Sequence, residues 1–318
     1  MLRLTDLKLP LEHSDDALRA AILLRLGVSA TELVSYSVYK RSYDARKRGH
    51  IVLIYSLDVA LSNEAAVLAR LAGDAHVGVS PDTTYQFVTA PPSGDFLRPL
   101  VIGFGPCGLF VALILAQMGF RPIVLERGKA VRERTKDTWG LWRKRELEPE
   151  SNVQFGEGGA GTFSDGKLYS QIKDPQHHGR KVLTEFVKAG APAEILYVSK
   201  PHIGTFKLVS MVEKMRAEII ALGGEIRFGQ RVEQLLLGLE PGGGFAAGLG
   251  LRLDGAEDLQ RVFGIIKEGQ HVAGDGGCGG RSAPAMFDHH GHGIAWGVIG
   301  RETHEQRMVA AVPGQVIV

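Results

Sequence analysis

The stretch Pro99-Leu-Val-Ile-Gly-Phe-Gly-Pro-Cys-Gly108 constrains the fold more than any other part of the chain. A short apolar run ends in glycines spaced Gly-x-Gly-x-x-Gly, and an apolar, helix-forming segment follows. Gly103 permits a sharp turn, Gly105 lets a pyrophosphate approach the backbone, and Gly108 lets the helix pack closely against the sheet. The pattern predicts a strand–turn–helix unit that binds a dinucleotide around Pro106, with the phosphates at the helix N-terminus.

A second predicted strand follows this helix. Arg121-Pro-Ile-Val-Leu125 is apolar and ends at Glu126, which lies 18 residues after Gly108. That spacing is close to the one expected for the acid that accepts a hydrogen bond from a ribose hydroxyl. Arg127 and Arg134 are candidates for phosphate or adenine contacts, although an arginine on a charged helix is commonly solvated. A glycine turn in another kind of α/β unit is the alternative interpretation.

A second glycine-rich segment, Gln154–Lys167, favours FAD over NAD. FAD is long, and its ribityl chain and ring system need backbone donors well away from the first turn. Asp165 and Lys167 are candidates to reach the flavin ring or a substrate, and Val232 is expected to bring a main-chain contact to the adenine. The candidate wrapping residues are Gly158, Gly159, Ala160, Gly161 and Thr162. An ordinary glycine loop with solvated charges is the alternative.

Residues 1–90 are predicted to form a separate small α+β domain. The expected order, β-α-β-β-α-β, resembles a ferredoxin-like split unit. Ser14 is the expected cap of the first helix, and Gly27 is expected to end it. The expected strands are 2–11, 33–42, 50–58 and 85–88, and the expected helices are 14–26 and 63–71.

The predicted organisation of the chain has four parts. They are a ferredoxin-like domain (1–90), a linker (91–97), a Rossmann-like FAD-binding domain with inserted helices (98–240), and an incomplete or degenerate continuation of the flavoprotein fold (241–318). Within the third part, helices are expected at 129–148, 177–190 and 205–222. A strand with a break at Gly229 is expected at 225–237, and 245–253 is a candidate hairpin arm.

The composition and net charge of the chain indicate which classes of binding partner to expect. The chain has 318 residues, of which 44% are hydrophobic and 23% charged, as in an ordinary globular protein. The net charge of +2 gives no strong attraction to nucleic acid or membranes, so neither partner is expected. We see no transmembrane segment, signal-peptide core or disulfide framework, which predicts a cytoplasmic location by default.

Several weaker features favour ordinary structural roles. Cys107 is interpreted as a small apolar filler rather than a redox group, and the basic segment 40–48 as a solvated turn. Asp275 sits in a short match to a second FAD signature. His289, His290 and His292 with Cys278 fit no zinc pattern, so no metal site is predicted.

Residues 98–235 resemble a bacterial family of uncharacterised FAD-dependent dehydrogenases, which are NAD(P)/FAD-dependent oxidoreductases. Five segments of the sequence carry the resemblance. They are the glycine turn, Leu125-Glu-Arg-Gly128, residues 132–139, the long motif at residues 151–167, and Lys200-Pro-His-Ile-Gly-Thr205. It implies FAD binding and a redox role, and residues 1–90 fit the small leading domain of the family. Family members continue past residue 318, so the resemblance implies a C-terminally truncated or degenerate tail here.

The resulting functional hypothesis is an FAD-dependent oxidoreductase. The flavin would pass electrons from a donor, for which NAD(P)H is the candidate, and the flavin would carry the chemistry. No catalytic residue, substrate or electron acceptor can be named from the sequence. The alternatives are a non-catalytic flavin-binding or truncated remnant protein, and a dehydrogenase that uses NAD alone.

Overall fold

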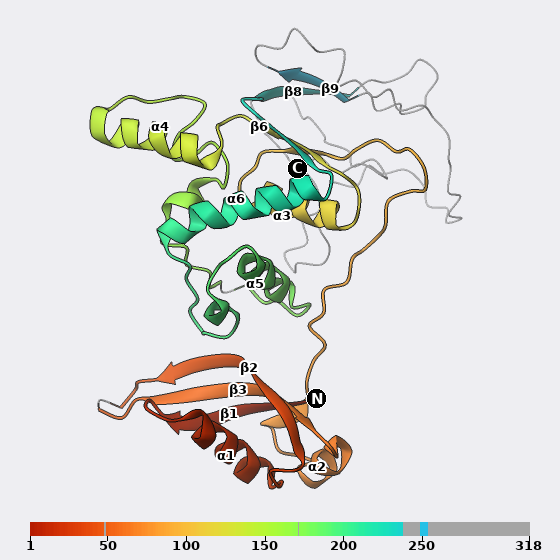
Figure 1. Ribbon diagram of the computed structural model, residues 1–318, viewed down its shortest axis with the longest axis vertical. Coiled ribbons are helices and arrows are strands. Elements are labelled where there is room, and N and C mark those ends of the chain that lie inside the picture. The colour runs from red at the N-terminus through yellow and green to blue at the C-terminus, as the bar shows by residue number, and fades with distance from the viewer. Residues whose placement is uncertain (48, 171, 238–248, 254–318) are drawn as a thin grey trace, which may run out of the picture. The chain divides into compact units, whose positions relative to one another are not determined.

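The computed structural model describes residues 1–47, 49–170, 172–237 and 249–253, which form a mixed α/β structure (Figure 1). The chain divides into two compact units. The first unit is Met1–Gln86 with Asp165–Lys207, and the second is Phe87–Ser164 with Leu208–Val318. The sequence-based division instead places residues 165–207 in the FAD-binding domain. Asp275 and Cys278, with the three histidines at 289, 290 and 292, lie outside the described residues.

The first unit is built on a four-stranded antiparallel sheet with the order β2-β3-β1-β4. Its strands are β1 (Leu2–Pro10), β2 (Leu33–Asp44), β3 (Val52–Leu61) and β4 (Val77–Val79), and its first two helices are α1 (Asp15–Leu26) and α2 (Glu64–Arg70). The predicted β-α-β-β-α-β order is confirmed, but the last strand is not 85–88. Val77–Val79 instead pairs with the free edge of β1, soon after α2 ends.

Local sequence explains where the helices of this sheet begin and end. The Ser14 hydroxyl accepts from the Ala17 N–H at 3.2 Å, and Gly27 ends α1 in the left-handed conformation (φ 61°). Asn63 caps α2 through its side chain. Alternate residues of β3 from Leu53 to Leu61 are buried and pack with the apolar face of α1. This core lies entirely within residues 2–77.

A later part of the chain completes the first unit. It contains α5 (His178–Lys188), the 3-10 turn η2 (Ala193–Leu196) and the first residues of α6 (Thr205–Ala221). The Arg41 N–H donates to the Tyr197 carbonyl at 2.6 Å, and the Ser199 N–H donates to the Arg41 carbonyl at 3.0 Å. The segment therefore pairs with β2, which is an edge strand of this sheet.

The second unit contains a parallel sheet with the order β5-β6-β7. Its strands are β5 (Leu100–Ile102), β6 (Ile123–Glu126) and β7 (Glu225–Phe228), and its helices are α3 (Pro106–Gln117), α4 (Val131–Lys144) and most of α6. The predicted break at Gly229 is confirmed, because Gly229 (φ 66°) turns the chain between β7 and β8 (Val232–Leu237). β8 pairs with β9 (Leu249–Leu253) in a separate antiparallel ribbon.

None of the helices in the described part of the chain is long and apolar enough to pass through a lipid bilayer.

Candidate functional site

The glycine turn joins β5 to α3 as the sequence predicts. Gly103 has a φ of 90°, a backbone conformation that favours glycine, and its N–H donates to the Leu125 carbonyl at 2.7 Å. Gly105 is the N-cap of α3, and Pro106 is its first residue. A Cβ on Gly108 would lie 2.1 Å from the Gly103 oxygen, so α3 could not pack this closely with any other residue there.

Glu126 ties this turn to the end of β6. Its buried carboxylate accepts from the Phe104 N–H at 2.7 Å and from the Gly128 N–H at 2.8 Å. The two bonds use different carboxylate oxygens, and each oxygen keeps a second lone pair. Glu126 therefore has a structural role that the sequence did not predict, in addition to its predicted role as a ribose acceptor.

The second glycine-rich segment packs directly on the first turn. The Gly158 N–H donates to the Phe104 carbonyl at 2.8 Å. A Cβ on Gly159 would lie 2.9 Å from Pro106 Cδ and 3.2 Å from Gly105 Cα, so these glycines allow the two backbones to touch. The two glycine motifs, about 50 residues apart in sequence, thus build one surface.

Not all of the predicted wrapping residues offer a free N–H. The N–H groups of Gly158, Gly159 and Thr162 donate to carbonyls of Phe104, Gly156 and Gly159. Ala160 and Gly161 begin the 3-10 turn η1 (Ala160–Phe163), where the first N–H groups have no partner within a helix. The expectation that all five residues present N–H groups to a ligand therefore needs correction.

Arg134 is placed differently from the prediction. It is fully buried and donates to the carbonyls of Asn152 (2.7 Å), Val153 (2.6 Å), Glu157 (2.7 Å) and Gly159 (2.8 Å). Its guanidinium also lies over the Phe163 ring, 4.8 Å from the centroid. Burial lowers the pKa of Arg134 to about 10, so it is still charged at neutral pH. It supports the second glycine loop from within rather than lining the pocket.

Glu157 is a buried support of the second glycine loop that the sequence analysis missed. It is fully buried, and its carboxylate accepts from the Val131 N–H at the start of α4 and from Arg216, both at 2.7 Å. Burial raises the pKa of Glu157 despite these contacts. A carboxylate inside a glycine-rich loop was the available clue, but its helix-capping role depends on how the loop folds.

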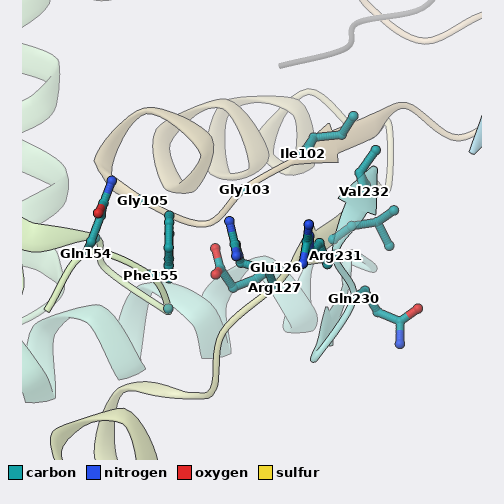
Figure 2. Close-up of a pocket in the computed structure, with 13 residues that line it drawn as sticks. Ile102, Gly103, Gly105, Glu126, Arg127, Gln154, Phe155, Gln230, Arg231 and Val232 are labelled. Atoms are coloured by element: carbon teal, nitrogen blue, oxygen red, sulfur yellow. The ribbon is translucent and has the colours of Figure 1, made fainter. Parts of the chain in front are cut away.

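A pocket of about 200 Å³ opens where these elements meet (Figure 2). This is below the roughly 300–1,000 Å³ of typical ligand pockets, so it suits one end of a dinucleotide. Figure 2 shows Glu126 and Arg127 between Gln154 and Phe155 on one side and Gln230 to Val232 on the other. The lining residues are Ile102, Gly103, Gly105, Leu125, Glu126, Arg127, Gln154, Phe155, Gly156, Gly159, Gln230, Arg231 and Val232.

Charged side chains at this pocket form a linked group. The Arg127 guanidinium lies 3.7 Å from the centroid of the Phe155 ring and donates to Glu150 at 2.8 Å. Arg231 donates to the other oxygen of Glu150 at 3.2 Å. The hydrogen bond from Arg127 and the nearby charge of Arg231 lower the pKa of Glu150. Glu126 also lines the pocket, so two arginines and two carboxylates meet here, and Arg127 and Arg231 are the cations that could contact an anionic ligand.

The remaining predicted residues lie elsewhere. Asp165 and Lys167 belong to the first unit, where they pair with each other at 3.1 Å. Their hydrogen bond lowers the pKa of Asp165 and raises that of Lys167. Cys107 is an exposed free thiol, and Arg46 of the basic turn pairs with Asp44 at 2.6 Å. Among the described residues, no group of three or more His, Cys, Asp or Glu side chains could hold a metal ion.

Parts of this chain are similar to known proteins. Residues 1–60 match the family model of a domain of unknown function, DUF8436. A curated relative from Clostridium beijerinckii, called "Uncharacterized protein", is 41% identical over 234 residues, which are 74% of this chain and 43% of that protein. The chain thus spans less than half the length of this relative.

A crystal structure of THI4 from Thermovibrio ammonificans is also similar to part of the chain. The match covers 49% of this chain and 47% of that chain, with 17% sequence identity and a TM-score of 0.30. A likeness at this level carries no argument about function, so the functional conclusion depends on the site itself.

Proposed function

We propose that the second unit is a Rossmann-like domain that binds FAD, and that the chain is part of an FAD-dependent oxidoreductase. The observation that carries this proposal is the contact between the two glycine motifs, made by the Gly158–Phe104 hydrogen bond and the approach of Gly159 to Gly105. A site for a short nucleotide needs only the first turn, whereas a second backbone surface beside it suits a longer dinucleotide. The first unit, by its strand order, we interpret as ferredoxin-like.

The residues present fit the dinucleotide in several ways. A Cβ on Gly103 would meet no atom within 4 Å, and a Cβ on Gly105 would meet only Gly159 Cα at 3.9 Å, so the space beside the turn is open. The start of α3 supplies N–H groups and the positive end of a helix dipole for phosphates. Glu126 would accept from a ribose hydroxyl, and the backbone of Val232 would contact the adenine.

Bound FAD would supply hydride and electron transfer, with NAD(P)H as the proposed donor. The described residues would bind and orient it. Glu126 would fix the ribose, Ala160 and Gly161 would donate N–H groups to the diphosphate, and Arg127 would balance its negative charge. We propose no acid, base or nucleophile, because none of these residues is placed against a reacting atom.

The proposal is tested by an absorbance spectrum of the purified protein, before and after anaerobic addition of NADH or NADPH. We expect flavin bands near ~370 and ~450 nm, and bleaching by one of the two nicotinamides. Bands without bleaching would contradict NAD(P)H as the donor. A colourless protein that does not take up added FAD would refute FAD binding, and NAD binding to that protein would favour an NAD-dependent dehydrogenase.

Gly105→Ala gives a sharp variant for this test. The new methyl group would fill the space beside the turn, where it meets only Gly159 Cα at 3.9 Å, so the fold should be kept while FAD binding is lost. Gly140→Ala in α4 is the matched control, since a Cβ there meets its nearest atoms at 3.9 Å and lies outside the pocket. Equal FAD binding by both variants would place the cofactor elsewhere.

A further inference from the structure

Arg134 holds the second glycine loop by its carbonyl groups. Four of its five N–H donors bind carbonyls within the short stretch from Asn152 to Gly159. The guanidinium is planar and its donors are fixed in a fork, so it sets the directions of the carbonyls that it binds. The loop is therefore folded around one cation.

This arrangement determines where the N–H groups of the loop point. In a planar trans peptide, the C=O and the N–H lie on opposite sides. Because the Glu157 carbonyl faces Arg134, the Gly158 N–H faces away and donates to Phe104. Because the Gly159 carbonyl also faces Arg134, the Ala160 N–H points away from the guanidinium in the same manner.

The outward side of this loop lies at the proposed phosphate site. Gly159 packs against Gly105 and Pro106, where α3 begins, and both glycines line the pocket. Gly159 therefore brings the next N–H in the chain, that of Ala160, near the start of α3, whose first N–H groups carry partial positive charge. Such a convergence of N–H groups is suited to an anion.

We propose that Arg134 is a positioning residue for the diphosphate of a dinucleotide. It draws the carbonyls of the second glycine loop inward, which turns the N–H groups of that loop toward the ligand. Arg134 does not itself touch the ligand, because it is fully buried and does not line the pocket. This inference rests on the proposed function, namely that the pocket binds a dinucleotide.

The packing around Arg134 leaves little room for another arrangement. Gly156 has a φ of 116°, and a Cβ on it would lie 2.4 Å from Arg134 Cδ. A Cβ on Gly128, on the other side of Gly156, would lie 2.5 Å from Gly156 Cα. A lysine at position 134 has its donors on one nitrogen, so it could not reach all four carbonyls at once.

The test uses the full chain with Arg134→Met, Arg134→Lys and the control Arg132→Met. Arg132 lies on the same helix, but its side chain is 69% exposed and pairs with Glu213. Two measurements are made: equilibrium binding of FAD, and hydrogen exchange of the amides in 152–163 and 103–108 without ligand. Arg134→Lys carries the test if Arg134→Met does not fold.

We expect both Arg134 variants to bind FAD at least about tenfold more weakly, the effect of losing one charged hydrogen bond. In the Arg134 variants, the amides of residues 152–163 should exchange faster, and those of residues 103–108 should exchange at the wild-type rate. Arg132→Met should match the wild type in both FAD binding and hydrogen exchange. Wild-type affinity in the Arg134 variants would overturn the inference. Weaker binding without faster exchange in the loop would also overturn it, because Arg134 would then act by direct contact.

A second ligand, inorganic pyrophosphate, distinguishes an error in the proposed function from an error in the inference about Arg134. If the wild type binds no FAD, that proposal is refuted, and the binding of inorganic pyrophosphate decides the inference. Pyrophosphate bound by the wild type and by Arg132→Met, but not by Arg134→Lys, would support the role of Arg134. Equal binding by all three, or by none of them, would overturn it.

Discussion

At the residue scale, Glu126 connects the glycine turn to the end of β6. A carboxylate accepts from both Phe104 and Gly128, whereas an amide would place an NH₂ donor against one of these N–H groups. We expect Glu126→Gln to lower the free energy of unfolding by about 1–3 kcal/mol and to weaken FAD binding. Urea denaturation measures the first effect. Glu146→Gln is the control, because the Glu146 side chain is 70% exposed, and unchanged stability in both variants would contradict this role.

Glu157 predicts a pH dependence of stability. Because burial raises its pKa, the folded state binds the proton more tightly than the unfolded state. The wild type should therefore lose stability relative to Glu157→Gln as the pH rises from about 4.5, the ordinary value for glutamate, through the raised pKa. The amide oxygen of glutamine can keep the hydrogen bonds from Val131 and Arg216.

Urea denaturation of both proteins between about pH 4 and 8 checks the prediction for Glu157. The difference in unfolding free energy should favour the glutamine variant increasingly with pH and then level off. If the unfolding free energies of the two proteins differ by the same amount at every pH in this range, burial does not raise the pKa of Glu157.

The roles of some residues could be predicted from the sequence, and the roles of others could not. Ser14, Gly27 and the glycines of the glycine turn act through their own backbone neighbours, so local patterns were enough to predict them. The roles of Arg134 and Glu157 depend on a loop that folds back on α4, and no local pattern distinguishes them from solvated charges. The sequence thus indicated the backbone geometry of the glycine turn well and its buried supports poorly.

At the element scale, the close approach of α3 to the glycine turn is open to test. Gly108→Ala would place a methyl group 2.1 Å from the Gly103 oxygen, so α3 or the turn must move. We expect a loss of about 1–3 kcal/mol in stability, as for other overpacked sites, together with weaker FAD binding. Gly140→Ala, in the interior of α4, should instead stabilise the protein by about 0.5–1 kcal/mol. Thermal unfolding of both variants distinguishes a steric effect from a general effect of replacing glycine.

The elements themselves were predicted unevenly, for physical reasons. Helices with capping residues and apolar strands flanked by turns were placed correctly, because their patterns are local. The three residues of β4 are too few to show alternation, and their pairing with β1 depends on the sheet that is already formed. The break between β7 and β8 was predicted from Gly229, but the different pairing partners of the two strands depend on tertiary structure.

At the scale of the whole molecule, the core of the first sheet predicts an independent fold. All of its buried residues lie between Leu2 and Val67, and the flanking residues extend only to Val77. We expect the fragment Met1–Gln86 to fold alone and to unfold cooperatively, since domains of this size can support a core. Far-UV circular dichroism during urea titration tests this expectation, and a gradual change without a transition would contradict it.

FAD should stabilise only the unit that binds it. At about 100 times its Kd, a ligand that binds only the folded state stabilises that state by about 2.7 kcal/mol. Hydrogen exchange with added FAD should therefore slow in β5, β6 and the two glycine motifs, while β1 to β4 stay unchanged. Protection confined to β1 to β4 would place the cofactor in the first unit instead.

The division of the chain has a practical consequence for proteolysis. The backbone passes from one compact unit to the other after Gln86, after Ser164 and after Lys207. A single cut in the proline-rich linker at 91–97 would therefore not release the N-terminal piece, because residues 165–207 still hold it through the backbone pairing with Arg41. On a denaturing gel the protein would show two fragments, while on a sizing column under native conditions it would still elute as one species.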